Sequence, residues 1–534
     1  MVRKRSLYPY LFVLLVLFLV YQPVLLGDYL MNDEMIWLGR DLGPRFKHHF
    51  LAYGRVLFGL YHSIVYDFVE YSVRKIQFVR LINFVGVSGL AVLLLWHLRK
   101  MLAHKILAVF AVLFFFAQPI FQGILAYSLQ IISNFQPAAW LSLLAFWIHF
   151  FSPISQAQSK TASITKVLLV AFVLILSLQS TQTYSFVFAI PLSIGALCKP
   201  EKFSFKSSSI FLGTAFSCLL FSTALYKVST SMTDLGYSKG RQLMSLSEKP
   251  VDAILNFFNP VTYSSAFRVW NYPVLFNNLE SVPKTGKSIV AVLVLLVFVA
   301  TIAIGIRTHL QRVNRNGGDA LKEVVLPWIL AAACLSFGAL FIFAESPFKP
   351  TDVRPHMTIT FVGVCLMMFV FSLDILLQHW STKFERERNR SVAIVAGFLC
   401  VSFVLLGAQS NALRNLVEVH ADALDFVRLE LLSKRPQDYQ VVQVVQAKSM
   451  CVSEPCEPWM GQQINAKWNK KAYKTEAGYR YAMASLRIKP NGKRIEYLDE
   501  RPAEIASDAV VIDWQRYLET KKRYKQYLRK SWRR

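Results

Sequence analysis

The chain has 534 residues, of which 54% are hydrophobic and only 17% are charged, and its formal net charge is +26. Soluble domains carry about 25% charged residues, so this composition, with a mean hydropathy of +0.37, argues against a soluble globular protein. Most Lys and Arg residues lie in short connections between apolar blocks and in the tail. That distribution excludes a nucleic-acid-binding surface as the reason for the charge. We therefore expect a polytopic membrane protein with no nucleic acid partner.

Apolar blocks recur along the first 409 residues, and a helix of ~20 residues crosses the hydrocarbon core. The first block, 7–26, follows a basic N-terminus but precedes no small-residue cleavage site, so we predict a retained span and not a signal peptide. Two short blocks, 167–180 and 184–198, form either two spans or one broken or re-entrant hairpin. Eight further blocks lie at 79–98, 106–123, 136–151, 208–226, 288–306, 324–344, 357–378 and 391–409. With the three named above, the sequence predicts an all-α membrane part of about eleven transmembrane helices.

Basic residues set the orientation of these spans. Lys and Arg are retained on the cytoplasmic side in short loops, and here they collect in alternate connections, at 3–5, 99–105, 160–166, 199–206, 307–322 and 383–390. We therefore expect a cytoplasmic N-terminus. The large loops 27–78 and 227–287 and the C-terminal domain 410–534 then lie outside.

The C-terminal region is too polar to span a membrane. Apolar residues recur at helical spacing over 413–431, and strand-like runs follow at 439–445 and 509–512. These features predict a small extracytoplasmic α/β domain. Its basic end, 521–534, is either a solvated tail or a partner for anionic membrane lipids.

The seven cysteines make no metal-ligand pattern. Five lie in or beside apolar blocks, where we expect packing roles. Cys451 and Cys456 lie close together in a polar region with no histidine nearer than His420. A disulfide is favoured over a zinc site there if the region faces an oxidising compartment, and an unpaired state is equally open.

An acidic pair, Asp33-Glu34, follows the first span, with Asp28 just before it. Adjacent carboxylates repel each other, and a basic partner, a helix N-terminus or a cation offsets that repulsion. Such a group can accept a proton or hold a metal ion. The alternative is a plain helix start, with Asn32 as the N-cap and the acidic pair in the first turn. The two interpretations are compatible.

Cations occur in two external loops. Arg55 ends a segment, 46–58, that alternates aromatic and basic residues, as in a helix on the membrane plane. Lys349, Arg354 and His356 lie in a loop that three prolines stiffen. Arginine and lysine at such a place suit a phosphate group, and the alternative is a rim of side chains that snorkel to the interface.

Ionisable residues are scarce within the spans. Arg80, His97, His149 and Asp374 lie near predicted span ends, where we expect interfacial anchors and not a proton relay. A transporter places ionisable groups at mid-membrane, so this pattern disfavours transport.

The layout resembles the GT-C superfamily of membrane glycosyltransferases, and within it the serotype-converting O-antigen glucosyltransferases of bacteria. The similarity covers roughly 1–435. It is carried by the acidic pair Asp33-Glu34, Gly39-Arg40, Tyr53-Gly54-Arg55, Arg80-Leu81-Ile82-Asn83 and Ser410-Asn411-Ala412-Leu413.

This resemblance implies a hexosyltransferase in the bacterial cytoplasmic (inner) membrane. It would move a sugar from a polyprenyl-phosphate donor to a cell-envelope glycan or lipid acceptor, such as lipopolysaccharide O-antigen, on the outer face. Asp33 or Glu34 would be the base. Relatives differ in their need for a divalent cation such as Mg or Mn, for which Asp28, Asp33, Glu34 and His48 are the candidate ligands.

Cations near the membrane surface would stabilise the departing lipid phosphate, and the candidates are Arg55, Lys349, Arg354 and His356. Two alternatives stay open. A polysaccharide polymerase or O-antigen ligase would depend on arginines and not on the acidic pair. A lipid or oligosaccharide flippase would need polar residues lining a mid-membrane cavity.

Overall fold

The fold is described from a computed structural model. It describes residues 7–27, 56–69, 72–116, 160–231, 284–345, 359–381, 385–445, 493–498 and 501–517, most of 118–152, and a few positions within 479–488 and 519–520.

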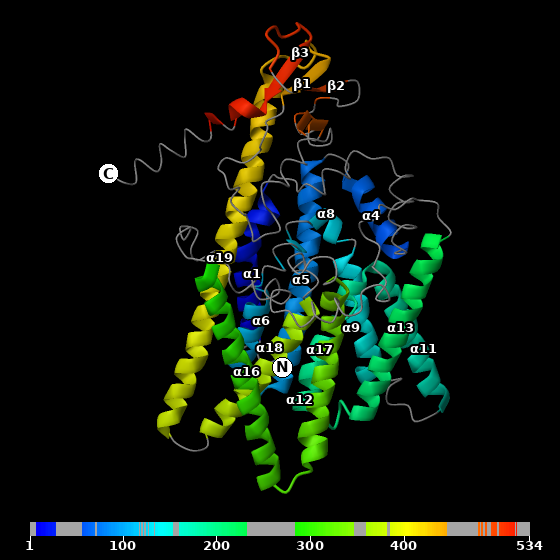
Figure 1. Ribbon diagram of the computed structural model, residues 1–534, viewed down its shortest axis with the longest axis vertical. Coiled ribbons are helices and arrows are strands. Elements are labelled where there is room, and N and C mark those ends of the chain that lie inside the picture. Colours follow the sequence, from blue (N-terminus) through cyan, green and yellow to red (C-terminus); the bar gives the residue numbers. More distant parts are fainter. Residues whose placement is uncertain are drawn as a thin grey trace.

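Helices make up nearly all of the described chain, and a small sheet follows them (Figure 1). The elements are α1 (Tyr8–Leu26), α4 (Val56–Val69), α5 (Val73–Met101), α6 (Lys105–Phe116), α8 (Ser128–Ile131), α9 (Phe135–Phe151), α11 (Lys160–Ser180), η2 (Gln182–Tyr184), α12 (Ala189–Cys198), α13 (Phe205–Ser231), α16 (Lys284–Arg315), η4 (Leu321–Val325), α17 (Leu326–Glu345), α18 (Ile359–Ser381), α19 (Glu385–Leu432), β1 (Val441–Val445), β2 (Arg494–Leu498) and β3 (Ala509–Asp513).

Seven helices of the described chain are long and apolar enough to cross a membrane. They coincide with seven of the eleven predicted blocks and lie in α1, α5, α11, α13, α16, η4–α17 and α18. Three other predicted blocks form shorter apolar helices: α6, α9 and η2–α12. The last predicted block lies within α19. The fold is thus that of a helical membrane protein with a small C-terminal sheet.

Local sequence accounts for several helix boundaries. Ser72 is the N-cap of α5, where its hydroxyl accepts from the backbone N–H of Lys75 at 3.4 Å. Arg99 and Lys100 occupy the last turn of the same helix, where cations suit the helix dipole. Asp319 lies just before η4, and its Oδ1 accepts from the backbone N–H of Leu321 at 3.1 Å. The hydrogen bonds from Lys322, with a smaller contribution from the Leu321 N–H, hold the pKa of Asp319 below its ordinary value.

The break between α11 and α12 is buried inside the helix bundle. It runs through η2 and a turn, and Thr181, Thr183 and Ser185 are buried within it. Ser185 donates to the backbone carbonyl of Thr181 at 2.7 Å, so side chains satisfy part of the broken backbone. The ten-residue α12 packs against α17 and α18. Because α11 is long and apolar enough to cross a membrane whereas η2–α12 is shorter, both alternatives for 167–198 stay open.

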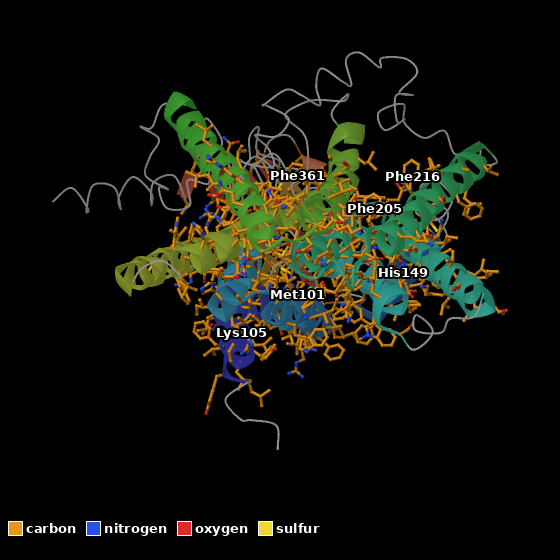
Figure 2. The ribbon with its side chains drawn as sticks, turned by 90° about the horizontal axis from the view of Figure 1, so that it is seen from below. Met101, Lys105, His149, Phe205, Phe216 and Phe361 are labelled. Atoms are coloured by element: carbon orange, nitrogen blue, oxygen red, sulfur yellow. The ribbon has the colours of Figure 1, made fainter. Side chains whose placement is uncertain are left out.

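Helix ends assigned to one side of the membrane contact each other. Asp374 of α18 binds the turn between α5 and α6, and Arg312 of α16 donates to Gln378 of α18 at 2.6 Å. Seen from this end in Figure 2, Met101 and Lys105 lie on the two sides of that turn, while α16 and α19 spread away from α11 and α13. The described contacts therefore bring together the turn between α5 and α6 and the ends of α16 and α18.

The C-terminal sheet has three parallel strands in the order β2-β1-β3. In the register, Val441 pairs with Arg494 and with Ala509. The predicted strands 439–445 and 509–512 are confirmed as β1 and β3, whereas β2 was not anticipated. The helix predicted over 413–431 is real, but it continues the preceding span without a break, so α19 runs 48 residues from the membrane part to the sheet (Figure 1).

Two hydrophobic cores hold the molecule together. The larger one lies among the membrane helices. The second joins α4, the first turns of α5 and α8 to the end of α19 and the sheet, through residues such as Tyr66, Val79, Leu431 and Val442. The C-terminal domain is therefore packed onto α4 and the first turns of α5.

The cysteines among the described residues are free. Cys218 and Cys334 are buried and Cys198 and Cys365 are half-buried, as packing roles require, whereas Cys400 is exposed. Cys451 and Cys456 lie outside the described residues, so their disulfide stays a prediction.

Candidate functional site

The predicted chemical groups all lie outside the described residues. This applies to the proposed base, the candidate cation ligands and the candidate phosphate ligands, namely Asp28, Asp33, Glu34, His48, Arg55, Lys349, Arg354 and His356. Their roles stay predictions. The structure does describe the helix ends from which the two loops start and to which they return.

The first loop starts at a tightly held point. Gly27, the C-cap of α1, is extended, and its N–H donates to the carbonyl of Pro23 at 3.0 Å. The guanidinium of Arg80 donates from Nη1 to the carbonyl of Gly27 at 2.8 Å. One turn earlier on α5, the side chain amide of Gln77 donates to the carbonyl of Leu26 at 3.2 Å. The residue before Asp28 is thus fixed by α5.

The same loop returns at α4, whose inner face packs under the C-terminal domain. Phe58, His62 and Tyr66 lie one turn apart and are all buried. The rings of His62 and Tyr66 are 4.4 Å apart between centroids, and those of Phe58 and His62 are 5.2 Å apart. The opposite face exposes Leu60 and Ile64. Of the surface helix expected over 46–58, only the last three residues are described, as the first turn of α4, so that expectation stays a prediction.

One helix next to each loop contacts the end of α6: α1, from which the acidic loop starts, and α18, to which the proline-rich loop returns. On one side, the hydroxyl of Tyr21 in α1 donates to the carbonyl of Phe116 at 2.6 Å. On the other, Gly363 of α18 lies so close to α6 that an added Cβ would be 3.3 Å from Phe115 Cε2. Gly363 is about one turn from the start of α18. The start of the acidic loop and the end of the proline-rich loop are therefore both next to helices that contact the end of α6.

A buried polar network follows Arg80 along α5. The amide of Asn83 donates to the carbonyl of Ile124 at 2.9 Å and contacts the hydroxyl of Ser128 at 3.2 Å. Gln136 donates to Asn83 Oδ1 at 2.8 Å, and Trp140 donates to Gln136 Oε1 at 3.1 Å. This network secures the irregular segment before α9. The sequence pattern includes Asn83 but does not indicate its partners, because these contacts join residues about forty or more positions apart.

The four ionisable residues expected as interfacial anchors are all buried, so that expectation is wrong. Arg80 is 1% exposed, and Asp374, His97 and His149 are similarly enclosed. His97 contacts the carbonyl of Pro191 at 3.1 Å, and His149 contacts Ser207. These side chains are near helix ends, and their contacts join separate helices and turns of the bundle.

Charged groups also collect at the end of β3 in the C-terminal domain. Asp513 is nearly buried, and its Oδ2 accepts from Arg501 at 3.4 Å. Burial raises the pKa of nearby Glu430 above its ordinary value, and Asp513 adds to the rise while Arg516 and Arg501 oppose it. Across the domain, Lys493 donates to the carbonyl of Pro436 at 2.6 Å, and burial lowers its pKa. The packing of α19 against β3 brings the charges of Glu430 and Asp513 close together.

Among the described residues, no group of three or more His, Cys, Asp or Glu side chains is placed to hold a metal ion. The candidate ligands predicted after the first span lie outside those residues, so a divalent cation stays a prediction.

No protein-family model, curated protein or solved structure matches this chain.

Proposed function

We propose that this protein is a membrane glycosyltransferase that moves a sugar from a polyprenyl-phosphate donor to a cell-envelope glycan or lipid on the outer face of a bacterial cytoplasmic membrane. The observation that carries the proposal is that α1 and α18 both contact the end of α6, through Tyr21–Phe116 and Gly363–Phe115. It supports a site to which the acidic loop and the basic, proline-rich loop both contribute.

The chemistry requires both loops. An acceptor hydroxyl loses its proton as it attacks the anomeric carbon, and Asp33 or Glu34 takes that proton. The glycosidic bond to the lipid phosphate breaks, and the phosphate departs with the electron pair as an anion. Lys349, Arg354 and His356, with Arg55 from the first loop, stabilise this charge more in the transition state than in the ground state.

The C-terminal domain is proposed to contact the acceptor. Support comes from its shared core with α4, which places the sheet over the end of the acidic loop. The N-terminus is then cytoplasmic and the sheet extracytoplasmic, as the basic connections favour. The donor's prenyl chain stays in the bilayer, which is consistent with the absence of a nucleotide-binding glycine-rich loop in the sequence.

The test is sugar transfer by the purified protein in liposomes, from a panel of polyprenyl-phosphate sugars to envelope glycan acceptors. The Asp33→Asn/Glu34→Gln double variant is expected to lose transfer while still binding donor. Asp438→Asn/Asp508→Asn is the matched control, because it removes two exposed carboxylates from the C-terminal domain. Wild-type activity that survives the loss of the acidic pair would refute the assignment of the base.

Replacement of Arg354 separates this proposal from a polymerase or ligase. For the glycosyltransferase, Arg354→Gln weakens transfer while the acidic pair remains essential. Loss of activity in Arg354→Gln together with full activity in Asp33→Asn would favour the arginine-dependent class. Movement of the intact lipid-linked sugar across the bilayer, without release of the lipid phosphate, would favour a flippase.

A further inference from the structure

Arg80 is a buried cation in an apolar helix. It lies in the second turn of α5 and is 1% exposed. Arginine keeps its charge at physiological pH, and an enclosed charge is costly unless acceptors surround it. A role that requires the charge would explain why an arginine and not a neutral residue occupies this place.

Its contact lies at the start of the acidic loop. Nη1 of Arg80 donates to the carbonyl of Gly27 at 2.8 Å, at the C-terminal end of α1. This end carries the negative pole of the helix dipole, which favours a cation. The next residue in the chain is Asp28, followed by Asp33 and Glu34. Arg80 thus holds the peptide group from which three carboxylates follow within seven positions.

Gln77 offers a natural comparison. Its amide binds the carbonyl of Leu26, one residue before Gly27 and from one turn earlier on α5. A neutral side chain therefore suffices to cap a carbonyl at this helix end. What Arg80 adds is a positive charge and a guanidinium with five donors.

We propose that Arg80 is a positioning residue for the acidic loop: it fixes the point at which the loop leaves α1 and offsets the negative charge that follows. The consequence for catalysis rests on the proposed glycosyltransferase function. The positioning itself does not, so the two are tested by different measurements.

The first measurement needs no activity. Trypsin cleavage after Arg40 in the purified protein in nanodiscs, followed by mass spectrometry, reports how firmly the loop is held. We expect cleavage to be ~10-fold faster or more in Arg80→Gln, because a charged hydrogen bond is lost. In the matched control Gln77→Leu, the change should stay below ~3-fold because the charge remains. Equal rates in these two variants would overturn the proposal.

The Arg80→Lys variant tests the charge directly and replaces Arg80→Gln if that variant does not fold. Lysine retains the charge with a different head group, so cleavage is expected to stay within ~3-fold of wild type. Cleavage of Arg80→Lys that is ~10-fold faster than wild type would overturn the role of the charge.

The second measurement concerns catalysis. Arg80→Gln should lower kcat ~10-fold or more and leave the donor KM within ~3-fold, because the carboxylate is displaced and the donor site is not. Adding Arg80→Gln to the Asp33→Asn/Glu34→Gln double variant should lower kcat no further than the double change does alone. The reason is that Arg80 is proposed to act through the same carboxylates that the double change removes. Fully additive losses would contradict the proposal. If the wild type transfers no sugar, the proposed function fails, and the cleavage rates still decide the role of Arg80.

Discussion

Asp374 of α18 is joined to His104, 270 residues earlier in the chain, by two polar contacts. The Oδ1 atom of Asp374 accepts from the His104 backbone N–H at 2.9 Å and contacts its Nδ1 at 2.7 Å. Oδ2 accepts from the Ala103 N–H at 3.0 Å and from Gln378 at 2.9 Å. One carboxylate of α18 therefore satisfies both backbone donors of the turn between α5 and α6.

Asp374→Asn should destabilise the protein by about 1–3 kcal/mol, because one carboxylate oxygen becomes an NH₂ group that faces N–H donors. Thermal unfolding in detergent with a thiol-reactive dye measures this, since buried Cys334 becomes reactive on unfolding. Asp319→Asn, on the exposed turn before η4, is the control and should change stability far less. An equal loss in both variants would contradict the prediction.

Gly338 is predicted to be essential for the packing of α17 against α18. A Cβ at this position would lie 2.5 Å from the backbone N of Phe361, an atom that cannot move aside as a side chain can. Gly338→Ala should therefore cost about 1–3 kcal/mol and also reduce transfer, because these helices carry the ends of the proline-rich loop.

Gly397 and Gly407 provide the matched control, since an added Cβ at either meets nothing within 4 Å. Gly397→Ala and Gly407→Ala should leave unfolding unchanged or slightly improved, as alanine favours helix. Thermal unfolding of the three variants side by side is the measurement. A Gly338→Ala protein as stable as these controls would show that the two helices can separate at no cost.

The sequence predicted most of the bundle because apolar blocks report helices directly. It placed the end of the 106–123 block too late. The helix α6 ends at Phe116, just before Gln118-Pro119, where a proline disfavours helix at the preceding residue. It also divided α19 in two, because the polar run Gln409-Ser410-Asn411 suggested a boundary that the continuous helix tolerates.

Long-range partners were beyond the sequence. Periodicity indicates that Arg80 and Asn83 share a face of α5, but not that the end of α1 and the segment before α9 cover that face. The strand β2 was missed because its side chains are largely half-exposed and it contains Arg494 and Glu496 among its five residues. Its alternation of Ile495 and Tyr497 was the available signal.

Leu431 is predicted to hold the C-terminal domain on the first external loop. It is fully buried in the core that contains Tyr66 and Val442. Leu431→Ala should cost about 2–5 kcal/mol in the unfolding of this core. Leu429→Ala, on the same helix but 70% exposed, should change stability by less than about 0.5 kcal/mol.

Hydrogen exchange of α4 in the two leucine variants is the measurement. Because α4 shares the core, its amides should exchange faster in Leu431→Ala and not in Leu429→Ala. Truncation after residue 435 should speed the exchange of the α4 amides even more than Leu431→Ala does, because it removes the whole sheet. Unchanged exchange in α4 would mean that the domain is only loosely attached.

Glu430 makes the stability of the C-terminal domain depend on pH. Burial raises its pKa above the ordinary value of 4.5, so the folded state holds the proton more tightly than the unfolded state. The stabilisation is fully present below the unfolded pKa and is lost as the pH rises through the folded pKa.

Glu430→Gln cannot ionise and should remove this loss. Its melting temperature should therefore rise relative to wild type between pH ~4.5 and neutrality, while the exposed control Glu504→Gln stays parallel to wild type. If the melting-temperature difference between Glu430→Gln and wild type instead shrinks as the pH rises, the prediction is contradicted. The attraction of Arg516 and Arg501 for the charged carboxylate would then outweigh the cost of its burial.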